Sequence, residues 1–483
     1  MDFFTRIVNE ISEIILKPID FVNNILWSYV MIIMLIALGL FFSIRTKFVQ
    51  FRYFFEMFKL MSESTSAESE GNGKHKKKIS SFQAFCISAA SRVGTGNLAG
   101  VAIAITSGGP GAVFWMWVIA FIGGATSFIE STLAQIYKVQ DGGNFRGGPA
   151  YYMEKALKQR WMGVIFVFLI MFTFGFAFNA TQANTIAGAC QKAFGIKPVY
   201  IGLVLSVITG LVIFGGLKRI ADISSMIVPV MAILYMACAL FVVIINIKYI
   251  PVVFTMIFES AFGIKQFLGG TFGSAILFGI KRGLFSNEAG MGSVPNAAAA
   301  AHTSHPAKQG FIQTLGVFFD TMLICSATAF ILLVYIAQTN TEELSVTGIQ
   351  FTQIALEYSI PGAQIFVAVC IFLFAWSSVI GNYFYGETNL SFLSSRKVYL
   401  SIFRVLVIVF IMAGSVASLN MVWAFADFTM ALMAIINLIA ITAISPVAVK
   451  SLKDYEKQKK SGKPPVFTKN SIPEITSDIE CWN

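Results

Sequence analysis

Residues Ala89 to Val101, which read AASRVGTGNLAGV, place polar and flexible residues inside an apolar segment. The segment as a whole, residues 82–106, is long enough to cross a lipid bilayer as a helix. Its centre nevertheless carries Arg92, Asn97 and two glycines, Gly94 and Gly96, and glycine weakens a helix interior. In lipid, unpaired backbone groups are tolerated only where protein covers them or where they line a cavity. The stretch therefore predicts a membrane helix that is interrupted at mid-depth and holds something polar.

The two helix ends created by such an interruption suit ligands of opposite charge. Backbone N–H groups at the start of a helix carry partial positive charge and bind carboxylates. Carbonyl oxygens at the end of a helix suit a small hard cation such as sodium. One interrupted helix can therefore hold an amino acid by its carboxylate with a sodium ion beside it.

The composition indicates a polytopic membrane protein. Of the 483 residues, 56% are hydrophobic and 12% are charged, whereas soluble domains have about 25% charged residues. The net charge of +10 comes from basic residues in loops between apolar segments, which favours a membrane-orientation signal over nucleic-acid binding. The chain has no HExxH pattern, no GxSxG motif and no phosphate-binding loop, so we do not expect an enzyme.

Eleven apolar segments are long enough to span a bilayer. We expect an all-α protein with spans at roughly 25–44, 82–106, 111–136, 161–187, 198–215, 222–247, 266–284, 309–337, 362–384, 397–418 and 420–445. Basic loops alternate with loops that are poor in basic residues, so the positive-inside rule places the amino terminus outside and the carboxyl terminus in the cytoplasm. Before the first span, an amphipathic helix within residues 1–27 is expected to lie at the membrane interface.

A second interrupted helix is expected between Phe267 and Gly283, where Gly269, Gly270 and Gly273 lie near the outer half. The span at residues 82–106 is the first of one set of five spans, and the span at residues 266–284 is the first of a second set of five. These two first spans cross the membrane in opposite directions. Inverted five-helix repeats that each start with an interrupted helix are typical of secondary transporters. Glycines that only allow close helix packing are one alternative, and a channel is another, although no continuous polar stripe is present.

These segments divide the chain into five parts. We expect the interfacial helix and an extra span in residues 1–61, a cytoplasmic linker in 62–80, the first inverted repeat in 81–250, the second in 251–447, and a cytoplasmic tail in 448–483. The linker and residues 451–483 are rich in polar residues and are expected to be solvated.

Four motifs resemble those of the sodium:alanine/glycine symporters, a family in the amino acid–polyamine–cation transporter superfamily. They read RVGTGNLAGVA at 92–102, GGPGAVFWMW at 108–117, KRGLFSNEAGMGS at 281–293 and YFYGE at 383–387. The resemblance implies an extra first helix and a 5+5 leucine-transporter-type core in a prokaryotic cell membrane. It also implies import of alanine or glycine, with sodium as the coupling ion and no other cofactor.

The resemblance further assigns residues to the two ligands. Those for the amino acid are Thr95, Gly96, Asn97, Phe176, Asn179, Gln182, Phe272, Gly273, Leu277 and Asn382. Those for sodium are the carbonyls of Ala90 and Val93, together with Phe374, Ser377 and Ser378. Family members restricted to tiny substrates have Gly-Trp-x-Tyr-Tyr where this chain has GNYFY at 381–385. A larger neutral amino acid such as glutamine therefore stays open as the substrate.

Five charged residues lie within or at the edge of apolar segments, namely Arg92, Glu130, Asp320, Glu387 and Asp427. Charge inside a membrane is costly and is usually paired or functional. We expect Arg92 to pair with one of these acids and to fix the interrupted helix; steering of the substrate carboxylate is the alternative. If a proton is the coupling ion, Glu130 or Asp320 is the expected carrier. Asn287 and Glu288 are expected in a cytoplasmic turn after the second interrupted helix.

Overall fold

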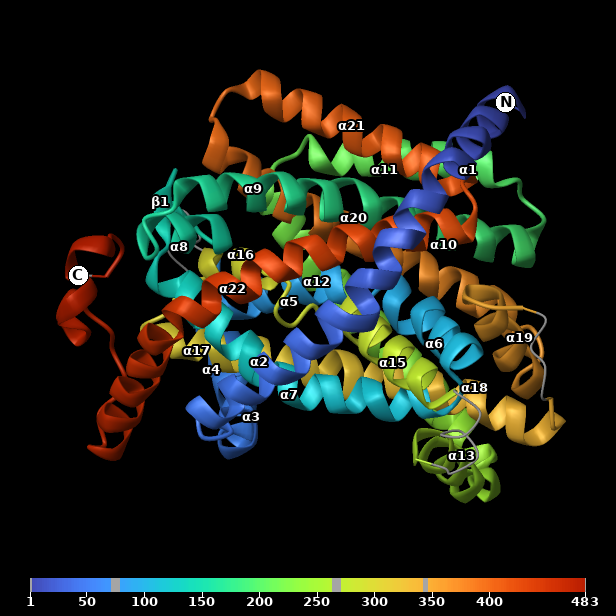
Figure 1. Cartoon of the computed structure of the whole chain (residues 1–483), viewed down its shortest axis with the longest axis horizontal. Coiled ribbons are helices and arrows are strands. Elements are labelled where there is room, and N and C mark those ends of the chain that lie inside the picture. Colours follow the sequence, from blue (N-terminus) through green and yellow to red (C-terminus); the bar gives the residue numbers. More distant parts are fainter. Residues whose placement is uncertain (1, 71–78, 263–270, 342–345, 483) are drawn as a thin grey trace.

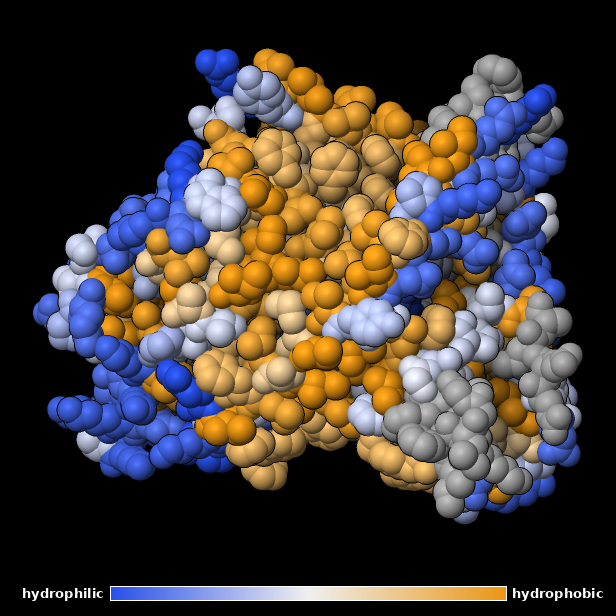
Figure 2. All heavy atoms as spheres, in the orientation of Figure 1, coloured by the Kyte–Doolittle hydropathy of each residue, from blue (hydrophilic) through white to orange (hydrophobic). Residues whose placement is uncertain are grey.

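The protein is described by a computed structural model that covers residues 2–70, 79–262, 271–341 and 346–482. Helices make up nearly all of these residues, and the amino and carboxyl termini lie at opposite ends of the molecule (Figure 1). Eight of the described helices are long and apolar enough to cross a membrane. Hydrophobic side chains cover the broad middle of the face in Figure 2, while hydrophilic ones gather at the two ends. The all-α membrane architecture expected from the sequence is therefore confirmed.

The first half of the chain contains the expected interruption between two short helices. Its elements are α1 (Asp2–Ile25), η1 (Leu26–Met31), α2 (Ile32–Arg45), α3 (Val49–Arg52), α4 (Phe54–Glu70), α5 (Ser81–Arg92), η2 (Gly96–Gly100), α6 (Val101–Gly108), α7 (Gly111–Ile136), β1 (Val139–Asp141), β2 (Asn144–Arg146), α8 (Pro149–Lys155), α9 (Arg160–Ile170), η3 (Met171–Phe178), α10 (Asn179–Phe194), α11 (Pro198–Ile213) and α12 (Leu217–Ile245). Strands β1 and β2 pair as an antiparallel hairpin.

The second half ends in a long helix and a short folded tail. Its elements are η4 (Ile247–Tyr249), α13 (Ile250–Phe262), α15 (Thr271–Asn287), α16 (Val294–Ala300), α17 (Pro306–Phe318), η5 (Phe319–Cys325), α18 (Ser326–Thr339), α19 (Ile349–Ser359), α20 (Ala363–Leu393), α21 (Lys397–Val416), α22 (Leu419–Lys460), η6 (Lys469–Ser471) and η7 (Pro473–Asp478).

Two groups of helices flank the interrupted helix. In the first, here called the α7 group, α7 packs along α15 and α17. In the second, the α10 group, α10 packs on α20 and α21, and α21 also packs on α11. Small residues permit the close approach within the α7 group: a Cβ atom at Gly279 of α15 would lie 2.5 Å from the carbonyl oxygen of Ala112 on α7. Helix α5 lies against α12 and α20, so the interruption faces the α10 group.

The structure adds a contact to one expectation about the ends of the chain and corrects two others. Helix α1 runs through η1 into α2 and is anchored along α22, because the Trp27 indole N–H donates to the Asp427 carbonyl at 3.2 Å. Helix α4 extends to Glu70, so the first half of the expected linker is helical, and residues 71–78 lie outside the described residues. Residues 461–482 are packed against the protein, with Phe467 and Trp482 buried, because their apolar side chains find apolar and cationic partners there.

Candidate functional site

Residues 93–95 interrupt the helix between α5 and η2, as the sequence predicts. The Gly94 N–H, which would bond to Ala90 in a continuing helix, donates instead to the Asn97 side-chain oxygen at 2.9 Å. The N–H and the hydroxyl of Thr95 both donate to the side-chain oxygen of Gln182 on α10, at 2.9 and 2.5 Å. These side chains are buried. The last carbonyls of α5 are therefore left without helical partners in the middle of the protein.

The Ser378 hydroxyl on α20 faces the carboxyl end of α5, and the Ser377 hydroxyl beside it faces Met231 on α12. The Ser378 hydroxyl donates to the carbonyl oxygens of Val93 at 3.3 Å and Phe374 at 3.0 Å, and the Ser377 hydroxyl donates to Phe374 at 2.8 Å. A Cβ atom at Gly94 would lie 2.2 Å from the Ser378 hydroxyl oxygen, so glycine is required for this approach. The structure thus brings Val93, Phe374, Ser377 and Ser378 together, with Ala90 buried in the preceding turn. Only neutral oxygens meet here, which is a suitable donor set for sodium.

Polar side chains of α10 and α20 meet on the other side of the interruption. Asn382 donates to the side-chain oxygen of Asn179 at 3.1 Å, and its own side-chain oxygen lies 2.7 Å from the Ser91 hydroxyl oxygen. With Gln182 bonded to Thr95, the expected polar residues Asn179, Gln182 and Asn382 all lie around the same interruption. All of them are buried.

The second interruption lies at residues 288–293, after α15 and not near its start. Helix α15 is continuous from Thr271 to Asn287, and α16 begins at Val294. Between them Glu288, Gly290 and Gly292 have φ values of +57°, +91° and +83°. This left-handed conformation favours glycine. The capping turn expected at Asn287 and Glu288 is present, because the Asn287 side-chain oxygen accepts a hydrogen bond from the Ala289 N–H at 3.0 Å, and Glu288 is buried between α15 and α16.

The residues expected to bind substrate at the start of α15 do not lie at the first interruption, where Thr95 and Gln182 meet. Gly273 is exposed and Leu277 is half-buried within the continuous helix, and no atom lies within 4 Å of a Cβ built at Gly273. The Phe272 side chain, Gly269 and Gly270 lie outside the described parts of the chain. A glycine at an exposed helix end can adopt the ordinary helical conformation. The two glycines of GMG at 290–292 have positive φ values, which a continuous helix does not allow. That motif mirrors GTG at 94–96, and it was the sequence signal for the second interruption.

Two buried glutamates accept hydrogen bonds from the residues of the second interruption. Glu130 on α7 accepts hydrogen bonds from the backbone N–H groups of Gly290 at 3.1 Å and Gly292 at 3.2 Å, and from the Asn437 side chain at 2.9 Å. Glu288 accepts from the hydroxyls of Ser91 at 2.7 Å and Ser293 at 2.6 Å. Ser91 precedes the first interruption, so the Ser91–Glu288 bond links the two interrupted helices directly.

Asp320 on η5 connects the first interrupted helix to α15. One of its carboxylate oxygens accepts from the Asn97 amide at 2.6 Å, and the other accepts from the Ser286 hydroxyl, also at 2.6 Å. Asp320 and both partners are buried. Ser286 was not among the site residues expected from the sequence.

Aromatic rings and an ion pair cover the amino end of η2. Phe285 packs against Phe178 and Trp423, with ring centroids 4.4 and 4.7 Å apart. The Arg282 guanidinium lies 4.4 Å from the Trp423 ring centroid and forms an ion pair with Asp427. A Cβ atom at Gly96 would lie 2.9 Å from the Phe285 ring. This arrangement closes the space above the interruption with large apolar surfaces.

Phe176 does not face the site as expected. Its ring stacks on Phe410 of α21, with centroids 4.6 Å apart and planes 19° apart. Residues two positions apart point to roughly opposite sides of a helix, so Phe178 faces the interruption instead and packs on Phe285. The sequence identified the correct segment and missed the register by two residues.

Arg92 also differs from its expectation. Among the described residues no carboxylate lies within ion-pair distance of its guanidinium, which donates to the Gln313 carbonyl at 3.2 Å. Asp427 pairs with Lys281 and Arg282, and the Glu387 carboxylate lies 3.6 Å from Arg404. Lys281 and Arg282 therefore lie inside the protein near the end of α15, where Asp427 compensates their charge.

Comparison with known proteins decides the family. Residues 12–469 match the family model described as the sodium:alanine symporter family. The chain belongs to the sodium:alanine symporter family. It is 55% identical to the amino-acid carrier protein AlsT of Bacillus subtilis, over 99% of this chain and 98% of AlsT. It is 50% identical to the probable sodium/glutamine symporter GlnT of the same organism, over 98% of this chain and 97% of GlnT.

A solved structure supports the fold of this symporter family member. The crystal structure of MhsT in complex with L-phenylalanine matches 78% of this chain and 98% of that chain, with a TM-score of 0.53 and 15% sequence identity. At this identity the likeness concerns the fold alone. Together with the family membership, it makes the protein a secondary transporter of several apolar helices.

Proposed function

We propose that the protein is a symporter that imports a small neutral amino acid, alanine or glycine, together with sodium. The observation that carries this proposal is the arrangement at residues 93–95. There the unpaired carbonyl end of α5 faces the Ser378 hydroxyl, and the Thr95 N–H and hydroxyl face Gln182 on the other side. A cation and an anion can thus bind to the same interruption on its two sides.

The amino acid binds by its carboxylate at Thr95, Gly96 and Asn97. The side-chain oxygen of Gln182 accepts both hydrogen bonds from Thr95, so it occupies the position that suits a carboxylate oxygen. A substrate carboxylate replaces this oxygen, and its charge is stabilised by the amino end of η2. The substrate side chain lies against Phe178 and Phe285, which limit its size. Asn179 and Asn382 bind the polar end of the substrate.

Sodium binds among the oxygens of Ala90, Val93, Phe374, Ser377 and Ser378. The hydroxyls of Ser377 and Ser378 turn their protons away from the ion and present their oxygens to it. Because no carboxylate is in this set, the ion contributes a full positive charge to the interruption. The ion thereby strengthens carboxylate binding at Thr95 and couples the two ligands.

Alternating access in this proposal follows from the two helix groups. The α7 group and the α10 group meet at the interruption, and rocking of one against the other exposes the site at either end. The proposal includes eleven spans, the extra N-terminal helix and the two inverted repeats in residues 81–250 and 251–447, with the carboxyl terminus in the cytoplasm of a prokaryote. The first spanning helix of the second repeat is then α15, and the interruption at residues 288–293 follows it.

A larger substrate such as glutamine is the second candidate. The Asn179–Asn382 pair supports it, because a buried amide pair can exchange hydrogen bonds with a substrate amide. The similarity to a probable sodium/glutamine symporter supports it as well. Proton coupling through Asp320 is a further variant, since its carboxylate touches both interrupted helices.

Uptake into proteoliposomes tests these proposals together. Labelled alanine, glycine and glutamine are supplied in turn, with an inward sodium gradient, with an inward proton gradient, or with neither. We expect saturable uptake of alanine or glycine that depends on the sodium gradient. Faster uptake of glutamine assigns the larger substrate, and a response to the proton gradient alone assigns proton coupling. Saturable uptake that ignores both gradients contradicts symport.

A further inference from the structure

Residues 461–482, here called the strap, form a folded segment after α22. In Figure 1 the carboxyl terminus lies at the same end of the molecule as α8 and the β hairpin. The strap buries five large apolar side chains, with Phe467 and Ile472 each 2%, Ile479 3%, Trp482 5% and Ile475 8% exposed. A solvated tail leaves such side chains in water, so the strap binds to a surface that fits it.

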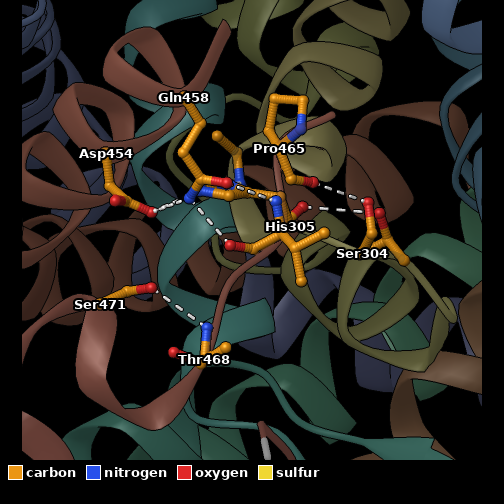
Figure 3. Close-up of polar contacts among 10 residues, drawn as sticks. Ser304, His305, Asp454, Gln458, Pro465, Thr468 and Ser471 are labelled. Carbon is orange, nitrogen blue, oxygen red and sulfur yellow. Dashed lines mark hydrogen bonds and ion pairs between the residues drawn. The ribbon is translucent and has the colours of Figure 1, made fainter. Parts of the chain in front are cut away.

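The first part of the strap is fixed to α22 and to the loop between α16 and α17. The Gln458 side-chain amide donates to the Val466 carbonyl at 2.8 Å, and its oxygen accepts from the Val466 N–H at 2.9 Å. The Phe467 N–H donates to the Ser304 carbonyl at 2.9 Å, and the Ser304 hydroxyl donates to the Pro465 carbonyl at 3.0 Å. Figure 3 shows Ser304, Pro465 and Gln458 in this arrangement. Gln458 and Ser304 thus each donate one hydrogen bond to the strap and accept one from it.

His305 lies at the centre of this first contact. Its ring packs edge-on against Phe467 of the strap at 5.5 Å and against Tyr455 of α22 at 5.2 Å. One ring nitrogen lies 3.2 Å from the Asp454 carboxylate, and the other accepts from the Ala307 N–H at 3.2 Å and caps α17. The strap therefore packs on the residue that caps α17 (Figure 3).

The last part of the strap reaches α7 and α8. The Trp482 indole N–H donates to the Gln135 carbonyl at the end of α7 at 3.0 Å, and the Lys138 ammonium lies 4.4 Å from the Trp482 ring centroid. Two ion pairs lie beside this contact: Glu480 with Lys155 at 2.5 Å and Asp478 with Lys158 at 2.6 Å. Lys155 ends α8 and Lys158 follows it.

These anchors belong to the two different helix groups. Gln135 lies at the end of α7, and Ser304 lies just before α17. Both helices belong to the α7 group. Helix α8 packs mainly on α9, which packs on α20, so Lys155 and Lys158 lie on the side of the α10 group, although α8 also touches α7. The strap runs from one group to the other at the end of the molecule where α8 lies. Any movement that separates the groups at this end stretches or breaks one set of its contacts.

We propose that the strap is a conformational clamp that holds the α7 group and the α10 group together at the end of the molecule where α8 lies. When the strap is bound, this end is closed; opening requires release of the Glu480 and Asp478 ion pairs or of Trp482. The clamp sets how often the end opens and therefore regulates the rate of transport. Its effect on transport rests on the proposed alternating access, whereas its effect on the distance between the groups does not.

Spin labels at Lys59 and Ser395 measure the opening directly. Lys59 is an exposed residue of α4, which packs on α17 of the α7 group, and Ser395 is exposed between α20 and α21. Pulsed-dipolar distances are recorded in a background with Cys238→Ser and Cys481→Ser, for the full chain and for the chain that ends at Ser461. We expect truncation to increase the population at the longer distance about threefold, because several weak contacts are lost together. An unchanged distance distribution in the truncated chain overturns the clamp.

A charge exchange controls for misfolding of the truncated chain. Glu480→Lys places like charges at the Lys155 pair and is expected to increase the long-distance population about twofold. The double variant Glu480→Lys with Lys155→Glu restores the opposite charges and is expected to return the distribution to that of the full chain. Failure of the double variant to restore it contradicts the clamp. Sodium-driven uptake by the same variants is expected to rise with the open population. If no variant shows uptake while the distances still shift, the result contradicts the proposed function and supports the clamp.

Discussion

Gly94 is the residue at which the ion side and the substrate side of the interruption meet. A Cβ atom there would lie 2.2 Å from the Ser378 hydroxyl oxygen and 2.9 Å from the Gln182 side-chain oxygen. A single methyl group thus displaces a proposed sodium ligand and a proposed substrate ligand together.

We predict that Gly94→Ala reduces sodium-driven uptake by at least about tenfold, because a buried overpacked site costs about 1–3 kcal/mol to accommodate. Gly210→Ala is the matched control. Its Cβ atom would lie 3.5 Å from Ile408, an ordinary contact, and alanine favours a helix. Initial rates in proteoliposomes check both variants, and equal rates for Gly94→Ala and Gly210→Ala contradict the assigned site.

His305 gives the end of the molecule near the strap a dependence on pH. Burial lowers the pKa of His305 below its ordinary value of 6.5, although Asp454 raises it in part and Lys308 lowers it. The folded protein therefore binds a proton at this ring less readily than the unfolded chain does. The resulting stability is complete above pH 6.5 and is lost as the pH falls below that value.

We predict that the wild-type melting temperature falls between pH 7.5 and pH 5.5 by more than that of His305→Asn. Asparagine also caps helices and does not titrate, so the variant retains the capping group and loses the proton-binding site. Thermal unfolding of the detergent-purified protein at the two pH values checks this. An identical fall in wild type and variant assigns the pH dependence to other groups.

At the scale of helices, the ion pairs of Asp427 join α15 to α22 above the interruption. Arg282 is 2% exposed and Lys281 is 14% exposed, and the Lys281 ammonium lies 2.7 Å from the Asp427 carboxylate. Arg282 also covers the rings of Trp423 and Phe285. The pairs therefore determine whether the aromatic cover stays above the site.

We predict that Asp427→Asn lowers the free energy of unfolding by about 3–5 kcal/mol, because it leaves buried cations without a counter-charge. Glu10→Gln removes the exposed pair between Arg6 and Glu10 and is expected to change the free energy by less than about 1 kcal/mol. Denaturant unfolding in micelles compares the two variants. Equal losses in both contradict the role of the buried pairs.

The helices also show what the sequence could reveal about the site. The first interruption was predictable, because GTG followed by asparagine inside an apolar segment has no simple packing explanation. The second was misplaced, because glycines that give room at a helix end look the same in sequence as glycines that need a positive φ. GMG at 290–292 was distinguishable only by its likeness to GTG at 94–96.

Side-chain direction was the part of the site that a sequence pattern does not determine. Phe176 and Phe178 lie in the same apolar run, and only the packing of η3 on α21 decides which ring faces the interruption. The partners of Arg282 and Lys281 were hidden for the same reason, since Asp427 lies far from them in the sequence. The strap was taken for a solvated tail because Phe467, Ile472, Ile479 and Trp482 are widely spaced among polar residues.

At the scale of the molecule, the first interruption lies between the α7 group and the α10 group, and two sets of ionic contacts join helices around it. Asp427 and its cations join α22 to α15 on one side of the site. At the end of the molecule where α8 lies, the strap joins α7 and α8 through Trp482 and Glu480. In the proposed alternating access each closure opens in turn, so both must be weak enough to break. Within the site, the contact between Ser91 and Glu288 joins the two interrupted helices.

The central claim is that sodium and the amino acid bind to the same interrupted helix and strengthen each other's binding. Calorimetric titration of the purified protein with alanine, in sodium chloride and in choline chloride of equal ionic strength, tests it most directly. We predict at least about tenfold tighter alanine binding in sodium for the wild type and a much smaller difference for Ser378→Ala. Equally tight alanine binding by the wild type in the two salts contradicts the claim.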